Sequence, residues 1–70
     1  MNKYLSNKVD YLDIENRIIK VLNDNSINLI KELYIKNRKE LKGYGLSDRD
    51  INQIIIKLQL IGLDLNGRKY

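Results

Sequence analysis

We predict an all-α fold, a compact domain of four to five short helices that includes a helix-hairpin-helix-like element. Apolar residues recur at helical spacing, and no segment alternates at period two strongly enough to form a strand. The 70-residue chain contains no Pro, so its four Gly and its runs of turn-forming residues mark the ends of the helices. This length allows one domain with a thin core. We expect a flexible leader at residues 1–8, the helical domain at 9–65 and a basic tail at 66–70.

The first helix is expected from Ile14 to Asn23, with Asp13 as its N-cap. Its apolar stripe consists of Ile14, Ile18, Val21 and Leu22. Two short helices are expected next. Asn28 can cap a helix over Leu29–Tyr34, and Asn37 can cap a single turn that ends near Leu41.

The last helix gives the clearest pattern. Ser47 is its expected N-cap, and Asp50, three residues on, completes a variant of the capping box. Gly62 and Leu63 fit a left-handed C-terminal ending. Ile54 and Leu58 are expected to anchor the core against Ile18, Leu22 and Leu33. Ile56 and Leu60 widen the apolar stripe of this helix, so we expect the other helices to wrap it.

Composition excludes several functions. The chain has no Cys and no His, which argues against a tetrahedral zinc site and removes both the thiol nucleophile and the commonest general base. We therefore expect no catalytic residue, no metal and no cofactor, so the chain is not an enzyme. Its apolar runs are too short to span a membrane, and a cytoplasmic location is expected. The net charge of +4 says little about partners until the charges are placed.

One motif points to a ligand. Gly43, Tyr44, Gly45 and Ser47 stand between two expected helices, as in the hairpin of a helix-hairpin-helix. Backbone amides of such a turn and the positive end of the next helix can bind a phosphate without reading bases. Arg49, in the first turn, can reach the same phosphate. The alternative is an ordinary glycine-containing turn, and Asp48 and Asp50 place negative charge beside the expected anion.

A family resemblance joins the two halves of the chain. Its residues are Val9-Asp10-Tyr11-Leu12-Asp13-Ile14, Arg17, Leu22, Ile27, Lys31-Glu32-Leu33, Ile51, Ile54, Leu58 and Gly62-Leu63-Asp64-Leu65. In order and spacing they resemble the C-terminal domain of the bacterial RNA polymerase alpha subunit. The resemblance covers roughly residues 9–65. It implies binding to the minor groove of A/T-rich double-stranded DNA, and contact with sigma factor, RNA polymerase or a transcription regulator.

The resemblance also implies site residues. Arg17 matches the arginine that enters the minor groove, and Lys20 stands where the family commonly has Asn. Asp10 and Asp13 match acidic positions of the sigma contact, although Asp13 also suits helix capping. The hairpin aligns in two ways, with either Gly45 or Ser47 on the family's glycine, and neither alignment keeps the usual Lys-Lys pair.

We therefore expect a transcription-related module that binds A/T-rich promoter DNA weakly through Arg17, Lys20, Gly43, Gly45, Ser47 and Arg49. The alternative is a protein-interaction module in which DNA binding is weakened or lost. The initial Met1 and the changed DNA-face residues favour a free-standing homologue over a piece of the larger polymerase chain. Arg17 is expected to be a surface residue whose removal leaves folding intact.

Overall fold

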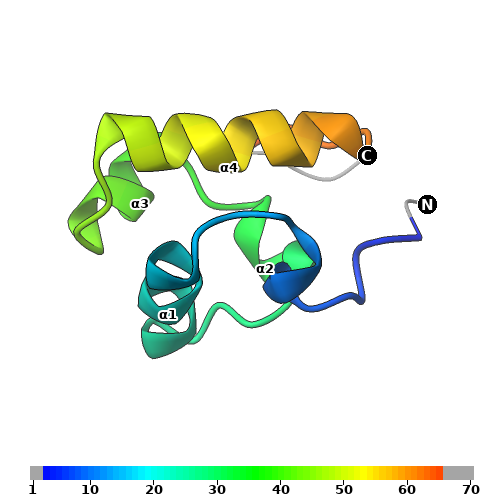
Figure 1. The fold of residues 1–70 in the computed structure, drawn as a ribbon, viewed down its shortest axis with the longest axis horizontal. Coiled ribbons are helices and arrows are strands. Elements are labelled where there is room, and N and C mark those ends of the chain that lie inside the picture. The colour runs from blue at the N-terminus through cyan, green and yellow to red at the C-terminus, as the bar shows by residue number, and fades with distance from the viewer. Residues whose placement is uncertain (1–2, 66–70) are drawn as a thin grey trace.

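The fold is described by a computed structural model, which places residues 3–65. In this range the elements are a 3-10 turn η1 (Val9–Tyr11) and the helices α1 (Asn16–Asp24), α2 (Ile30–Leu33), α3 (Arg38–Gly43) and α4 (Asp48–Leu60). The long helix α4 lies on one side, and α1, α2 and η1 lie on the other (Figure 1). No strand forms within residues 3–65, where Lys8 and Leu29 make an isolated antiparallel bridge. The prediction of an all-α domain is confirmed.

The core takes buried apolar side chains from every helix. Its members are Val9, Leu12, Ile14, Ile18, Leu22, Ile27, Ile30, Leu33, Leu41, Leu46, Ile51, Ile54, Leu58 and Leu63. The expected anchors Ile54 and Leu58 are fully buried, as are Ile18, Leu22 and Leu33. Burial of large aliphatic side chains is the main favourable contribution to the stability of so small a domain.

The end of α4 is a complete Schellman motif. The amide of Leu63 donates to the carbonyl oxygen of Leu58 at 2.9 Å, and the amide of Gly62 donates to that of Gln59 at 3.0 Å. Gly62 has a φ of 83°, a left-handed conformation that glycine adopts without steric cost. The predicted ending of the last helix is therefore confirmed.

Two further helices end in the same way. In α3, Leu46 donates to Leu41 at 3.3 Å and Gly45 has a φ of 101°. In α1, Ile27 donates to Leu22 at 2.8 Å and the left-handed residue is Ser26, with a φ of 65°. Each of the three helix ends has the same six-residue sequence pattern: Leu, any three residues, Gly or Ser, then Ile or Leu. The first and the last residue of each pattern are buried. We call these three motifs the helix-end closures.

The start of α1 differs from the prediction. Its N-cap is Glu15, not Asp13, and the helix begins at Asn16. Ile14 belongs to the extended segment that precedes the helix, and its side chain is buried in the core. Its amide donates to the carbonyl of Leu12 at 2.8 Å. The Asp13 side chain is 99% exposed. Packing of Ile14 into the core therefore delays the helix by about one half-turn, so Asp13 lies outside it.

Two other helix boundaries also differ. The expected helix over Leu29–Tyr34 begins at Ile30, and its N-cap Leu29 has no side-chain oxygen. The carboxylate of Glu32 instead accepts the amides of Asn28 and Leu29, both at 2.9 Å. Asn37 caps α3 as predicted by accepting the amide of Glu40 at 2.8 Å, but this helix continues past Leu41 to Gly43.

The segment before η1 is hydrogen-bonded to the start of α2. The carbonyl of Asn7 accepts the amide of Ile30 at 2.9 Å, and the carbonyl of Leu5 accepts that of Lys31 at 3.0 Å. Tyr4 and Leu5 pack against the core. The part of the expected loose leader that the structure describes is thus attached to the domain. The expected basic tail, residues 66–70, lies outside the described residues.

The outer face of α4 is not covered. We expected the other helices to wrap this helix, but Ile56 is 56% exposed and Leu60 is 73% exposed. That prediction is wrong, because the short helices α1, α2 and α3 reach only the face of α4 that carries Ile51, Ile54 and Leu58. A domain of this size has too few elements to cover a helix on every side.

Candidate nucleic-acid interface

Three of the predicted DNA-contact residues meet at the start of α4. Arg17, in the first turn of α1, donates two hydrogen bonds to the carboxylate of Asp50, at 2.8 and 3.1 Å. Asp50 in turn accepts the amide of Ser47 at 3.2 Å, and Arg49 is its neighbour in the chain. The structure thus brings Arg17, Ser47 and Arg49 to one end of α4, although Arg17 and Asp50 are 33 positions apart.

The local sequence explains why Asp50 lies at this position. The hydroxyl of Ser47 accepts the amide of Asp50 at 3.2 Å, so the two residues form the predicted capping box. This arrangement turns the Asp50 carboxylate back towards the domain, where only 5% of the residue is exposed. A carboxylate in such a place needs donors, and Arg17 supplies two of them.

The pairing shifts the pKa of both groups. The Arg17 guanidinium, with help from the Ser47 amide, holds the pKa of Asp50 well below its usual range, although burial acts in the opposite direction. Asp50 likewise raises the pKa of Arg17, with a smaller contribution from Glu15. Both groups are therefore charged at neutral pH, and the interaction is a charge-assisted, two-pronged hydrogen bond.

Arg17 is engaged but remains accessible. Its side chain is 57% exposed, and one terminal nitrogen also lies 3.4 Å from a carboxylate oxygen of Glu15. A guanidinium has five N–H donors, so donors beyond those used here can reach a ligand. Two carboxylates nevertheless flank this cation, and they reduce its attraction for an approaching phosphate or minor groove.

The amides of the hairpin are already hydrogen-bonded. Gly45 donates to the carbonyl of Lys42 at 3.0 Å, Leu46 to that of Leu41 at 3.3 Å, and Ser47 to the Asp50 carboxylate at 3.2 Å. A phosphate that used these amides would have to displace the present acceptors. Gly43 is the last residue of α3. The roles of Gly43, Gly45 and Ser47 as phosphate contacts stay predictions.

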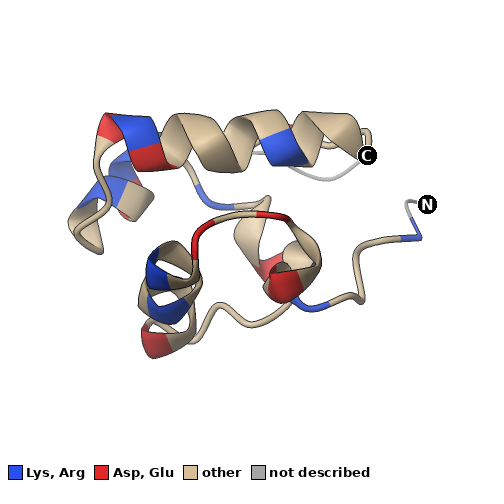
Figure 2. Cartoon of the chain, in the orientation of Figure 1, with Lys and Arg blue, Asp and Glu red and all other residues tan. Residues whose placement is uncertain are grey.

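Carboxylates also accompany most of the other cations around the site. Asp48 lies 3.0 Å from the ammonium of Lys42 and 3.2 Å from the guanidinium of Arg38. Hydrogen bonding to Lys42, with a smaller contribution from Arg38, lowers the pKa of Asp48. Lys20 pairs with Asp24 at 3.3 Å. Figure 2 shows the result, with acidic and basic positions interleaved on α3 and at the start of α4.

The two acidic residues expected to contact a partner lie in the segment before α1. Asp10 is an exposed residue of η1. Asp13 is also exposed, and its carboxylate lies 3.9 Å from the ammonium of Lys57 on α4. Both carboxylates are accessible to another protein, and neither caps a helix. Their proposed role in a sigma contact stays a prediction.

The described part of the chain lacks two features that would point to other kinds of site. Within residues 3–65 there is no group of three or more carboxylates close enough together to hold a metal ion. In the same range no helix is both long and apolar enough to cross a membrane.

No protein-family model matches the chain, and no curated protein matches it. The case for a nucleic-acid interface therefore rests on the positions of Arg17, Ser47 and Arg49 at the start of α4, and on the family resemblance of the sequence.

Proposed function

We propose that this domain is a transcription-related module that binds A/T-rich double-stranded DNA weakly through the minor groove. One observation carries the proposal: Arg17 on α1 and Arg49 on α4 lie at the same end of α4, where the positive end of that helix also lies. The resemblance to the polymerase alpha domain implies the same grouping. Narrow A/T minor grooves concentrate negative potential and attract an inserted arginine.

In this proposal Arg17 enters the groove, while Lys20 and Arg49 contact phosphates. Arg17 can act in two ways, because it can use its remaining donors or leave Asp50 altogether. Either way Asp50 competes with DNA for the same guanidinium. Weak binding follows from this competition and from the carboxylate of Glu15 beside the same cation.

Titration of an A/T-rich duplex at low salt tests the proposal, with a G/C-rich duplex of equal length as the control. Asp50→Asn removes the competing charge, so it should strengthen binding severalfold. Arg17→Ala should abolish binding in the wild-type and Asp50→Asn backgrounds alike. The log–log salt dependence should have a slope of about −0.9 for each phosphate contact. Equal affinity of the wild type and Arg17→Ala would contradict the proposal.

A second candidate function is a protein-interaction module with DNA binding weakened or lost. The observation that favours it is the neutralisation of the candidate DNA face, where Asp50 and Glu15 engage Arg17 and Asp48 engages Arg38. The partner would be sigma factor, RNA polymerase or a transcription regulator, contacted through Asp10 and Asp13.

A pull-down from lysate of the source cell separates the two candidates. Recovery of polymerase or sigma factor that survives nuclease, and that is lost with Asp10→Ala combined with Asp13→Ala, supports the second candidate. Recovery that disappears with nuclease treatment supports the DNA-binding module instead.

A further inference from the structure

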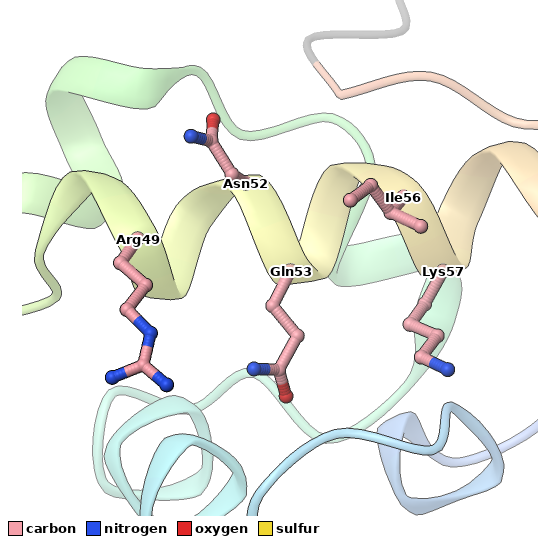
Figure 3. A pocket seen from close by; sticks show the side chains of 5 residues that line it. All are labelled: Arg49, Asn52, Gln53, Ile56 and Lys57. Carbon is pink, nitrogen blue, oxygen red and sulfur yellow. The ribbon is translucent and has the colours of Figure 1, made fainter.

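The outer face of α4 carries an open groove. It has a volume of about 530 Å³ and is lined by Arg49, Asn52, Gln53, Ile56 and Lys57. Figure 3 shows Arg49, Gln53 and Lys57 along one edge of this groove and Asn52 and Ile56 along the other. A smaller hollow of about 200 Å³, lined by Tyr11, Leu12, Asp13, Lys57, Leu60 and Ile61, adjoins it. Lys57 lines both hollows, and we call the surface that the two make together the α4 groove.

This surface gathers exposed apolar side chains. Ile56 is 56% exposed, Leu60 is 73% exposed and Tyr11 is 54% exposed. Among residues 3–65, the other large apolar side chain with comparable exposure is Ile35, at 51%, which lines a different hollow. Contiguous apolar surface on a small domain is typical of a site that contacts another protein.

The charges on the larger hollow are all positive. Arg49 and Lys57 line it together with Ile56, and no carboxylate does. In the described part of the chain no carboxylate forms an ion pair with Arg49, while the exposed Asp13 is the partner of Lys57 at 3.9 Å. The whole chain has a net charge of +4, so a second copy would bring more positive charge. Complementarity therefore favours an acidic partner.

We propose that the α4 groove binds an acidic amphipathic helix of another protein. Apolar side chains one turn apart on that helix would cover Ile56 and Leu60, and flanking carboxylates would pair with Arg49 and Lys57. The stretch from Arg49 to Leu60 is roughly 16 Å long at 1.5 Å per residue, which matches about three turns of the bound helix. The groove shares Arg49 with the proposed phosphate contacts and Asp13 with the proposed partner contact. The inference goes beyond the proposed function because its centre, Ile56 and Leu60, is used in neither of those contacts, and because its ligand is an acidic helix.

The test uses a synthetic peptide of about four turns, with Leu at positions 1, 5, 8 and 12 and Glu at the flanking positions. The complete chain labelled with ¹⁵N is titrated up to about 1 mM peptide and followed by NMR. We expect shifts in the resonances of Asn52, Gln53, Ile56 and Lys57. A peptide with Lys in place of every Glu, and one with the same composition in scrambled order, serve as controls and should bind far more weakly.

Matched substitutions locate the contact. Ile56→Ser should weaken peptide binding about tenfold, because it removes an apolar side chain that binding would bury. Ile35→Ser changes the same residue type at comparable exposure outside the groove, so it should leave the affinity unchanged. Both side chains are half exposed in the domain, and circular dichroism would confirm that both variants fold.

Several outcomes would overturn the inference. These are the absence of shifts up to the highest peptide concentration, shifts centred on Ile35, or equal binding by Ile56→Ser and wild type. Self-association in sedimentation equilibrium that Ile56→Ser abolishes would make the groove a homodimer surface instead. Duplex DNA that shifts the same resonances and still binds Ile56→Ser would make it a nucleic-acid surface. Arg17→Ala in the Asp50→Asn background removes the proposed DNA contact and should leave peptide binding intact, so the two proposals can fail separately.

Discussion

The two ends of α4 are held by different kinds of interaction. At its C-terminal end, the backbone bond from Leu63 to Leu58 and the burial of both side chains close the helix. At its N-terminal end, Ser47 and Asp50 cap the helix, and Arg17 from α1 neutralises Asp50. The first end is apolar and built from neighbours in the chain. The second end is charged and depends on a distant residue, so its strength depends on pH and on competing ligands.

The largest expected effect is at the apolar end. Leu58→Ala should lower the free energy of unfolding by roughly 2–5 kcal/mol, because the Leu58 side chain is fully buried in the core. A small domain has about 5 kcal/mol of stability, so we expect a largely unfolded variant at room temperature. Circular dichroism during urea or thermal unfolding measures this, and the exposed Leu60→Ala is the matched control. A similar loss in both variants would contradict the assignment of Leu58 to the core.

The next effect belongs to the charged end and depends on pH. The pKa of Asp50 is lower in the folded chain than in the unfolded chain, so its stabilising contribution is complete above the unfolded value of about 3.9. The contribution is lost as the pH falls further and the folded carboxyl takes up a proton. We expect the urea midpoint of the wild type to fall steeply below about pH 4. The midpoint of Asp50→Asn should fall less steeply, and this variant should already be less stable than the wild type at pH 7. Parallel pH profiles would show that Asp50 is not the group responsible.

A smaller effect distinguishes the two hairpin glycines. Gly45 has a φ of 101°, so Gly45→Ala should cost about 1–2 kcal/mol, although the added methyl group would meet no atom within 4 Å. Gly43 lies within α3 and also has free space, so Gly43→Ala should stabilise the domain by about 0.5 kcal/mol. Chemical denaturation of both variants measures whether each substitution lowers or raises the free energy of unfolding. A Gly45→Ala variant as stable as the wild type would mean that the closure of α3 does not require a left-handed residue at this position.

The smallest effect concerns the closure of α1. Ser26 has a φ of 65°, where a residue with a side chain is strained and glycine is not. Glycine also makes the unfolded chain more flexible, which offsets part of the gain. Ser26→Gly should therefore raise the free energy of unfolding by up to about 0.5 kcal/mol. Differential scanning calorimetry can resolve this, and a lower melting temperature would contradict it.

The apolar end of α4 was predictable because its signals lie within a few residues. Helical spacing identified Ile54 and Leu58, and Gly62 followed by Leu63 identified the ending. The same six-residue pattern occurs at Leu22–Ile27 and Leu41–Leu46, and it could have located two more helix ends. Helical spacing did not predict that Ile56 and Leu60 are exposed. The sequence of a helix that is apolar on several sides does not show which side the neighbouring helices cover.

The charged end was predictable only in part. Ser47 and Asp50 were correctly assigned to the capping box, since they lie three positions apart in the sequence. The bond between Arg17 and Asp50 joins residues that are 33 positions apart, and no periodicity in a single sequence links them. Arg17 therefore looked like a free surface cation. Our expectation that its removal leaves folding intact needs correction, because Arg17→Ala leaves a buried carboxylate without its main donor.

The helix-end closures have a consequence for the rate of folding. Each one joins residues only five positions apart, such as Leu22 and Ile27, so the chain loses little entropy when it forms. Proteins dominated by contacts of short sequence separation fold within microseconds to milliseconds. The bonds that the start of α2 donates to the carbonyls of Leu5 and Asn7, and the bond between Arg17 and Asp50, span much longer stretches. We expect the closures to form early, and these distant contacts to complete a domain whose helix ends are already set.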